Sequence, residues 1–144
     1  MFWKCNRNKR TDSDTAYLAV HGYEKTEELK QTITQLEKLA ETNGALLCKK
    51  YQKTFESQGK SNLQIWVARD IDGTESAQLT SSDSFEDEYR SQLAIDFEGE
   101  KFDDDFYAYS ITLWYSSRGT GTLYDISTND LSADIEKALL RNLY

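Results

Sequence analysis

Apolar residues recur along the chain with two different spacings, which predict two helices among several strands. The first helix begins after Thr26, a residue type that caps helix N-termini, and ends at Asn43-Gly44, a typical helix stop. Its apolar positions lie three or four residues apart, as one face of a helix requires: Leu29, Ile33, Leu36 and Ala40. The second helix follows Thr128 or Asp130, and its apolar stripe consists of Leu131, Ile135, Ala138 and Leu139.

Strands are expected where apolar residues form short runs or alternate with polar ones. Such segments cover residues 16–23, 45–55, 63–67, 93–98 and 106–116, with a return strand at 122–127. Asp72-Gly73 predicts a hairpin turn, and residues 75–80 a short strand after it. Phe85, Tyr89 and Leu93 are spaced as on one face of a short helix.

The strongest strand pattern, residues 106–116, has apolar groups on both faces and predicts a central strand covered at least in part on both sides. One face carries Tyr107, Tyr109, Ile111, Leu113 and Tyr115. The other face carries Phe106, Ala108, Ser110, Thr112 and Trp114.

Strands grouped between two helices predict the α+β class. We expect a mainly antiparallel sheet of about five to six strands with two main helices packed on one face. The 144 residues fit a single domain at residues 15–144, after a basic polar N-terminal tail at residues 1–14. A chain of this length buries enough surface to fold without a disulfide or a metal.

The amino-acid composition excludes several kinds of segment and bears on the state of the cysteines. Proline is absent, which excludes polyproline recognition segments. No apolar run is long enough for a transmembrane helix, and the first ten residues lack the apolar core of a signal peptide. Cys5 and Cys48 are expected to be free thiols in a cytoplasmic protein, with one disulfide in an oxidising compartment as the alternative.

The net charge of −8 lies entirely within residues 83–105, which we call the acidic block. The block holds ten acidic and two basic residues, whereas the rest of the chain is balanced. Nine of the aromatic residues fall within the overlapping segment 85–115. An excess of negative charge disfavours nucleic acid as a ligand and favours a basic protein partner.

The sequence therefore favours a non-catalytic binding protein of the inhibitor or immunity type, which docks a basic surface of a partner such as a toxin or nuclease. The expected contact residues are Glu86, Asp87, Glu88, Asp103, Asp104 and Asp105, with Tyr89 and Phe102 as aromatic anchors. The competing interpretation is a solvated acidic loop followed by a core strand, with the aromatic residues inside.

Signals for catalysis or metal binding are weak, so we expect no enzyme activity, no cofactor and no metal site. Asp103-Asp104-Asp105 point to alternate sides of an extended segment, and Asp70-Ile71-Asp72-Gly73 places its glycine too early for an EF-hand. One histidine and two distant cysteines match no zinc motif. Nucleophilic catalysis by Cys48 with His21 requires neighbouring strands, and Asp96 and Glu98 face outward, unlike a buried glycosidase acid.

Two other classes of function stay open. A small-ligand sensor or enzyme would use an aromatic pocket between sheet and helix, lined by Trp66 and Trp114. A structural subunit would associate with copies of itself through an exposed sheet face.

Overall fold

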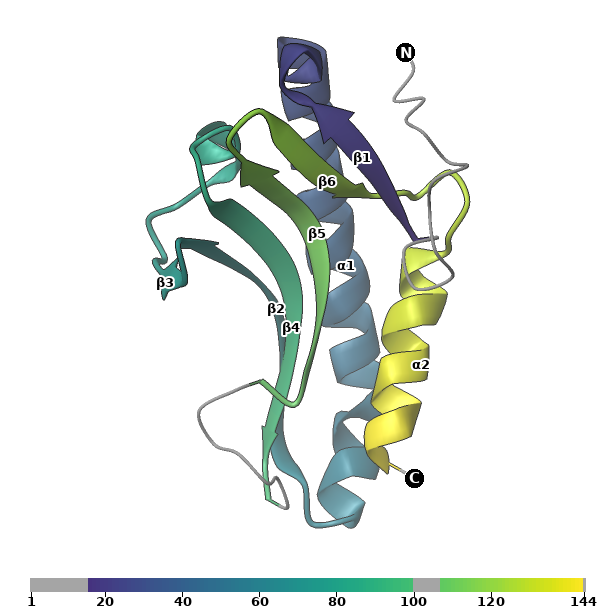
Figure 1. Cartoon of the computed structure of the whole chain (residues 1–144). Helices are drawn as coiled ribbons and strands as arrows, with labels where there is room; N and C mark the ends of the chain where they lie inside the picture. Colours follow the sequence, from purple (N-terminus) through teal and green to yellow (C-terminus); the bar gives the residue numbers. More distant parts are fainter. Residues whose placement is uncertain (1–15, 100–106, 144) are drawn as a thin grey trace.

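A computed structural model describes residues 16–99 and 107–143 and confirms the α+β class (Figure 1). Six antiparallel strands form one sheet in the order β1-β6-β5-β4-β2-β3. The long helix α1 and the shorter α2 lie side by side and pack against the sheet, and a buried apolar core fills the space between the two layers. The elements are β1 (Tyr17–His21), η3 (Gly22–Glu24), α1 (Glu27–Ser57), β2 (Ser61–Ile71), β3 (Thr74–Glu75), η4 (Ser81–Asp83), β4 (Tyr89–Glu98), β5 (Tyr109–Ser117), β6 (Thr120–Tyr124) and α2 (Leu131–Leu143).

Helix α1 does not end at Asn43-Gly44, and the strand expected at residues 45–55 is its second half. Leu47 and Phe55 continue the buried stripe of the first half at helical spacing. Gly44 is a close-packing position, because a Cβ there would lie 2.9 Å from Cγ2 of Ile65 in β2. The glycine allows the helix to approach the sheet closely and does not act as a stop.

The short helix expected from Phe85, Tyr89 and Leu93 is also wrong, since Tyr89 begins β4. Glu88 has a φ of 67°, a left-handed conformation that an α-helix cannot continue through. Before it, only the short η4 helix forms, with Thr80 as its cap. Of the strand expected at residues 75–80, only Glu75 lies in a strand, as the second residue of β3.

A β-bulge changes the two faces expected for β5. Ser91 pairs with Trp114 and Gln92 pairs with Thr112, so Leu113 is an extra residue in β5. The expected alternation therefore reverses after the bulge: Trp114 turns into the core, fully buried, and Tyr115 turns to the opposite face. The Trp114 indole N–H is satisfied there by the backbone oxygen of Ser84, at 2.7 Å.

Candidate docking surface

Four loops meet at one end of the sheet, and backbone hydrogen bonds connect them. The Gly22 N–H donates to the Gly119 oxygen at 2.7 Å, the Asp72 N–H to the Glu88 oxygen at 3.1 Å, and the Glu88 N–H to the Ser116 oxygen at 2.8 Å. The β5–β6 hairpin thus joins both the end of β1 and the loop that leads into β4 (Figure 1). We call this surface the loop rim and define it as residues 21–25, 72–73, 84–88 and 117–120.

The loop rim is negatively charged. Its cations are Lys25 and Arg118, and its carboxylates are Glu24, Asp72, Glu86, Asp87 and Glu88. The Lys25 ammonium makes two intramolecular hydrogen bonds, to Ser116 Oγ at 3.0 Å and to the Ser117 backbone oxygen at 2.9 Å. Partial burial lowers the pKa of Lys25, while nearby Asp87 acts in the opposite direction. Arg118 lies 3.9 Å from Asp87 with its side chain almost fully exposed, too loose a pair to neutralise the surface.

Tyr23 projects from the same surface into solvent. It is 82% exposed, the largest value among the exposed apolar side chains of the described residues. Its ring stacks on His21 with 5.3 Å between centroids and 6° between planes. The expected strand at 16–23 placed Tyr23 in a buried run, but β1 ends at His21. The one sequence signal for exposure was its position after Gly22, outside the apolar alternation.

A hollow of about 630 Å³ opens beside the loop rim on the sheet face opposite the helices. Asp70 is held in its wall by Arg90 Nε at 3.2 Å and by the Gly73 N–H at 3.2 Å. The Tyr115 hydroxyl donates to Glu88. This hydrogen bond is the largest cause of the raised pKa of Tyr115, and burial is the second. The lining residues are Tyr17, Asp70, Asp72, Gly73, Glu88, Arg90, Thr112, Tyr115 and Thr122.

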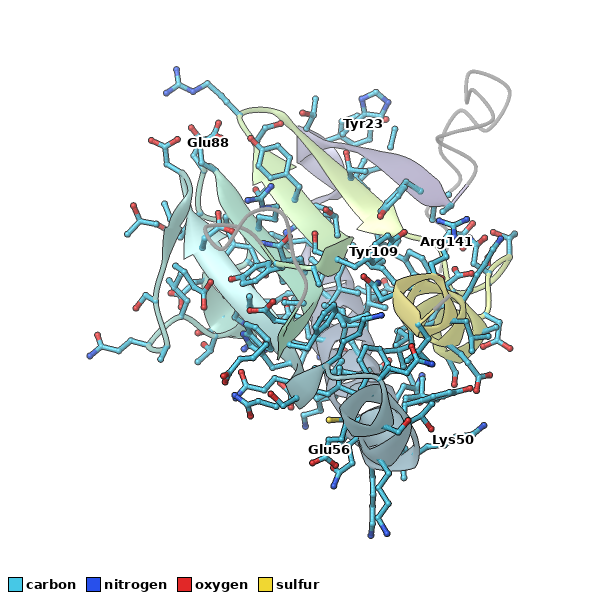
Figure 2. The ribbon with its side chains drawn as sticks, turned by 90° about the horizontal axis from the view of Figure 1, so that it is seen from below. Tyr23, Lys50, Glu56, Glu88, Tyr109 and Arg141 are labelled. Carbon is cyan, nitrogen blue, oxygen red and sulfur yellow. The ribbon has the colours of Figure 1, made fainter. Side chains whose placement is uncertain are left out.

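The structure brings together three of the residues expected to contact a partner. Glu86 and Asp87 are exposed, and Glu88 is half-buried in the loop rim, where it also lines the hollow (Figure 2). Tyr89 instead lies in the core with no exposed surface, and its hydroxyl donates to Glu37 at 2.7 Å, so it cannot anchor a partner. Phe102, Asp103, Asp104 and Asp105 lie outside the described residues.

The described acids of the acidic block do not form one patch. Glu86, Asp87 and Glu88 precede β4, whereas Asp96 and Glu98 lie towards its other end. Ten residues of extended strand measure roughly 30 Å. Glu98 accepts a hydrogen bond from Asn62 at 2.8 Å there. Clustering in sequence therefore becomes clustering in space only for the first group.

The two tryptophans expected to line an aromatic pocket between sheet and helix, Trp66 and Trp114, do not face the same space. Trp114 faces the helices in the core, while Trp66 lies on the other sheet face, edge-on to Tyr107 at 5.2 Å. His21 and Cys48 are also separated, because Cys48 contacts the backbone oxygen of Leu63 in β2 and three strands lie between β1 and β2. Within residues 16–99 and 107–143, no group of three His, Cys, Asp or Glu side chains is placed to hold a metal ion.

Comparison of the chain with known proteins finds no family model, curated protein or solved structure that matches it. None of the helices in the described part is both long and apolar enough to cross a membrane.

Proposed function

We propose that this protein is a non-catalytic acidic binding protein that docks a basic surface of a partner protein through the loop rim. The single observation that carries the proposal is the gathering of five carboxylates, only two cations and the exposed Tyr23 on four connected loops. An inhibitor or immunity protein that masks the basic active-site rim of a toxin or nuclease would use such a surface.

The two kinds of residue have complementary roles in docking. Clustered carboxylates speed the encounter with a basic partner and disfavour acidic ones, an effect that salt weakens. A tyrosine supplies contact area with few rotatable bonds, and tyrosines are enriched among the residues that dominate binding energy. Glu86 and Asp87 provide the field, and Tyr23 provides the anchor beside it.

The connection between the loops supports the same role. Loops that are already held by backbone hydrogen bonds lose little conformational freedom when a partner binds, so less of the contact energy is spent on ordering them. The three hydrogen bonds that connect the loop rim all lie between 2.7 and 3.1 Å. The backbone that carries the carboxylates is therefore already held in place before a partner binds.

The test uses an oligoarginine peptide as the probe and amide NMR as the readout. We expect the peptide to shift amide signals of the loop rim in a saturable way. Glu86→Lys should weaken the apparent affinity several-fold and reduce its salt dependence. The matched control is Glu56→Lys, which makes the same charge change at another exposed glutamate, near the end of α1 (Figure 2).

Equal effects of Glu86→Lys and Glu56→Lys would reject the loop rim as the docking surface. A triple substitution of Asp103, Asp104 and Asp105 by lysine forms the second arm. If the triple variant loses peptide binding while Glu86→Lys binds the peptide as tightly as the wild type, the docking surface lies at residues 103–105 and the proposal is rejected.

A second candidate function is the binding of a small cationic ligand in the hollow. Its volume of about 630 Å³ lies within the range of small-molecule sites, and Asp72 and Glu88 line it. Saturable binding of free arginine methyl ester at Glu88 and Tyr115, without any effect of Tyr23→Ala, would favour this candidate. The proposed place of action for either function is the cytoplasm, which fits the free thiol of Cys48.

A further inference from the structure

The sheet has a gap between β5 and α2, away from the loop rim. Strand β6 pairs only with residues Trp114–Ser117 of β5, so the segment from Tyr109 to Leu113 has no strand partner on that side among the described residues. A cavity of about 250 Å³ occupies the gap. Figure 2 shows two of its lining residues, Tyr109 at the start of β5 and Arg141 on α2.

Two cations line this cavity. Lys137 and Arg141 are four residues apart on α2, so their side chains lie on the same face of the helix. Neither makes an ion pair with any described residue. Among the described residues of the lining, the one carboxylate is Asp134, which already accepts a hydrogen bond from the Tyr124 hydroxyl. The cavity is thus positive in a protein whose net charge is −8.

Stabilisation of the helix dipole accounts for Arg141, which lies in the last turn of α2, but not for Lys137. Cations near a helix C-terminus are favourable chiefly within the last turn. At the end of α2, the Lys60 ammonium already donates to the Asn142 backbone oxygen at 2.6 Å. Lys137 lies more than a turn before the end of the helix, where the dipole offers it little. Both side chains are exposed, so an anion that enters the cavity can reach them from solvent.

Hydroxyl groups complete the lining. Tyr17, Tyr109 and Ser110 border the cavity together with the two cations. The Tyr17 ring is fixed edge-on against Tyr124, at 5.9 Å and 81°. A tyrosine hydroxyl is protonated at neutral pH and can donate. Burial and, to a smaller extent, the neighbouring Tyr109 and Asp134 raise the pKa of Tyr17 further.

We propose that this cavity binds a phosphoryl oxyanion, held by Lys137 and Arg141 and oriented by the hydroxyls of Tyr17 and Ser110. The guanidinium group offers paired donors that match two phosphate oxygens, and the ammonium adds a point charge. A volume of about 250 Å³ accepts inorganic phosphate and leaves room for a small group esterified to it. The site is independent of the loop rim and has the opposite polarity.

The test is thermal unfolding and amide NMR of the whole chain with inorganic phosphate, phosphoserine or acetate, at constant ionic strength. We expect phosphate to raise the midpoint of unfolding in a saturable way and to shift the amides of Ser110, Lys137 and Arg141. Acetate should have a clearly smaller effect. Stabilisation by phosphoserine equal to or above that by phosphate identifies a phosphoryl group on a larger molecule as the ligand, and a smaller one identifies free phosphate.

The decisive comparison is between two variants with the same loss of charge. Lys137→Gln combined with Arg141→Gln should weaken phosphate binding by at least about tenfold, because two charge-assisted contacts are lost. Lys38→Gln combined with Lys53→Gln removes two exposed lysines of α1 and should leave phosphate binding unchanged. Non-saturable shifts, or the same loss in both variants, would overturn the proposal.

Discussion

Glu37 of α1 and Arg69 of β2 form an ion pair between the helix and the sheet, with Arg69 Nη2 2.8 Å from Glu37 Oε1. Glu37 is 1% exposed, and its buried carboxylate is stabilised by this pair and by a hydrogen bond from the Tyr89 hydroxyl. A second carboxylate, Glu41, lies 3.5 Å from Arg69 but is half-exposed. The pair ties α1 to β2 and to the first residue of β4.

We expect Glu37→Ala to lower the free energy of unfolding by about 3 kcal/mol, because it removes the main partner of the largely buried Arg69 and the carboxylate that accepts from the Tyr89 hydroxyl. Glu41→Ala, which removes only the exposed contact, should cost less than about 1 kcal/mol. Urea unfolding of the two variants measures the difference. Similar losses in both would contradict the assignment of Glu37 as the main partner.

Gly44→Ala should destabilise the protein although alanine is the better helix former. Helix propensity favours alanine by about 1 kcal/mol, but the added methyl group collides with Ile65 and overpacking costs about 1–3 kcal/mol. In an Ile65→Ala background the collision is removed, so the same Gly44→Ala change should become stabilising. A double-mutant cycle by urea unfolding tests this, and a stabilising Gly44→Ala in the wild-type background would refute it.

Stability should fall steeply above about pH 10, where unperturbed tyrosines ionise. Burial, together with hydrogen bonds to Glu37 and Asp134, raises the pKa values of Tyr89 and Tyr124. The unfolded chain therefore loses protons that the folded protein keeps, and the stabilisation present below about pH 10 is lost as the pH rises, by about 1.4 kcal/mol per pH unit for each tyrosine.

Tyr124→Phe isolates one of these contributions. The variant also loses the hydrogen bond to Asp134, so the slope of unfolding free energy against pH is the readout, not its absolute value. We expect that slope above about pH 10 to become shallower by about 1.4 kcal/mol per pH unit, which corresponds to one proton. An unchanged slope would mean that Tyr124 ionises normally in the folded protein.

Tyr23→Ala separates the docking role of an aromatic residue from a structural one. The side chain is 82% exposed, so the unfolding free energy should change by less than about 0.5 kcal/mol. If the loop rim docks a partner, binding of the oligoarginine peptide or of a natural partner should weaken by about tenfold. Leu46→Ala, at another exposed apolar side chain, is the control that should leave binding unchanged. Strong binding by Tyr23→Ala would remove Tyr23 from the docking surface.

Local chemistry allowed several features to be read from the sequence. Thr26 caps α1 as expected, accepting a hydrogen bond from the Leu29 N–H at 3.3 Å. Asp72 and Gly73 make the expected hairpin turn, with φ values of 51° and 82°. The stripe on α2 predicted four of its five buried residues, all but Leu143, because helical spacing and burial coincide when a helix covers one face of a core. The α+β class followed from the order of these elements.

Other features depend on contacts between residues that are distant in sequence, so only the tertiary structure decided them. Gly44 lies inside a helix because Ile65, distant in sequence, requires close approach there. The bulge at Leu113 depends on pairing with β4, which no local spacing records. Likewise Glu86, Asp87 and Tyr23 share a surface only because β4 and β6 flank β5 and β1 pairs with β6. Alternation and caps are properties of a few neighbouring residues, whereas a surface made from four loops is set by which strands pair.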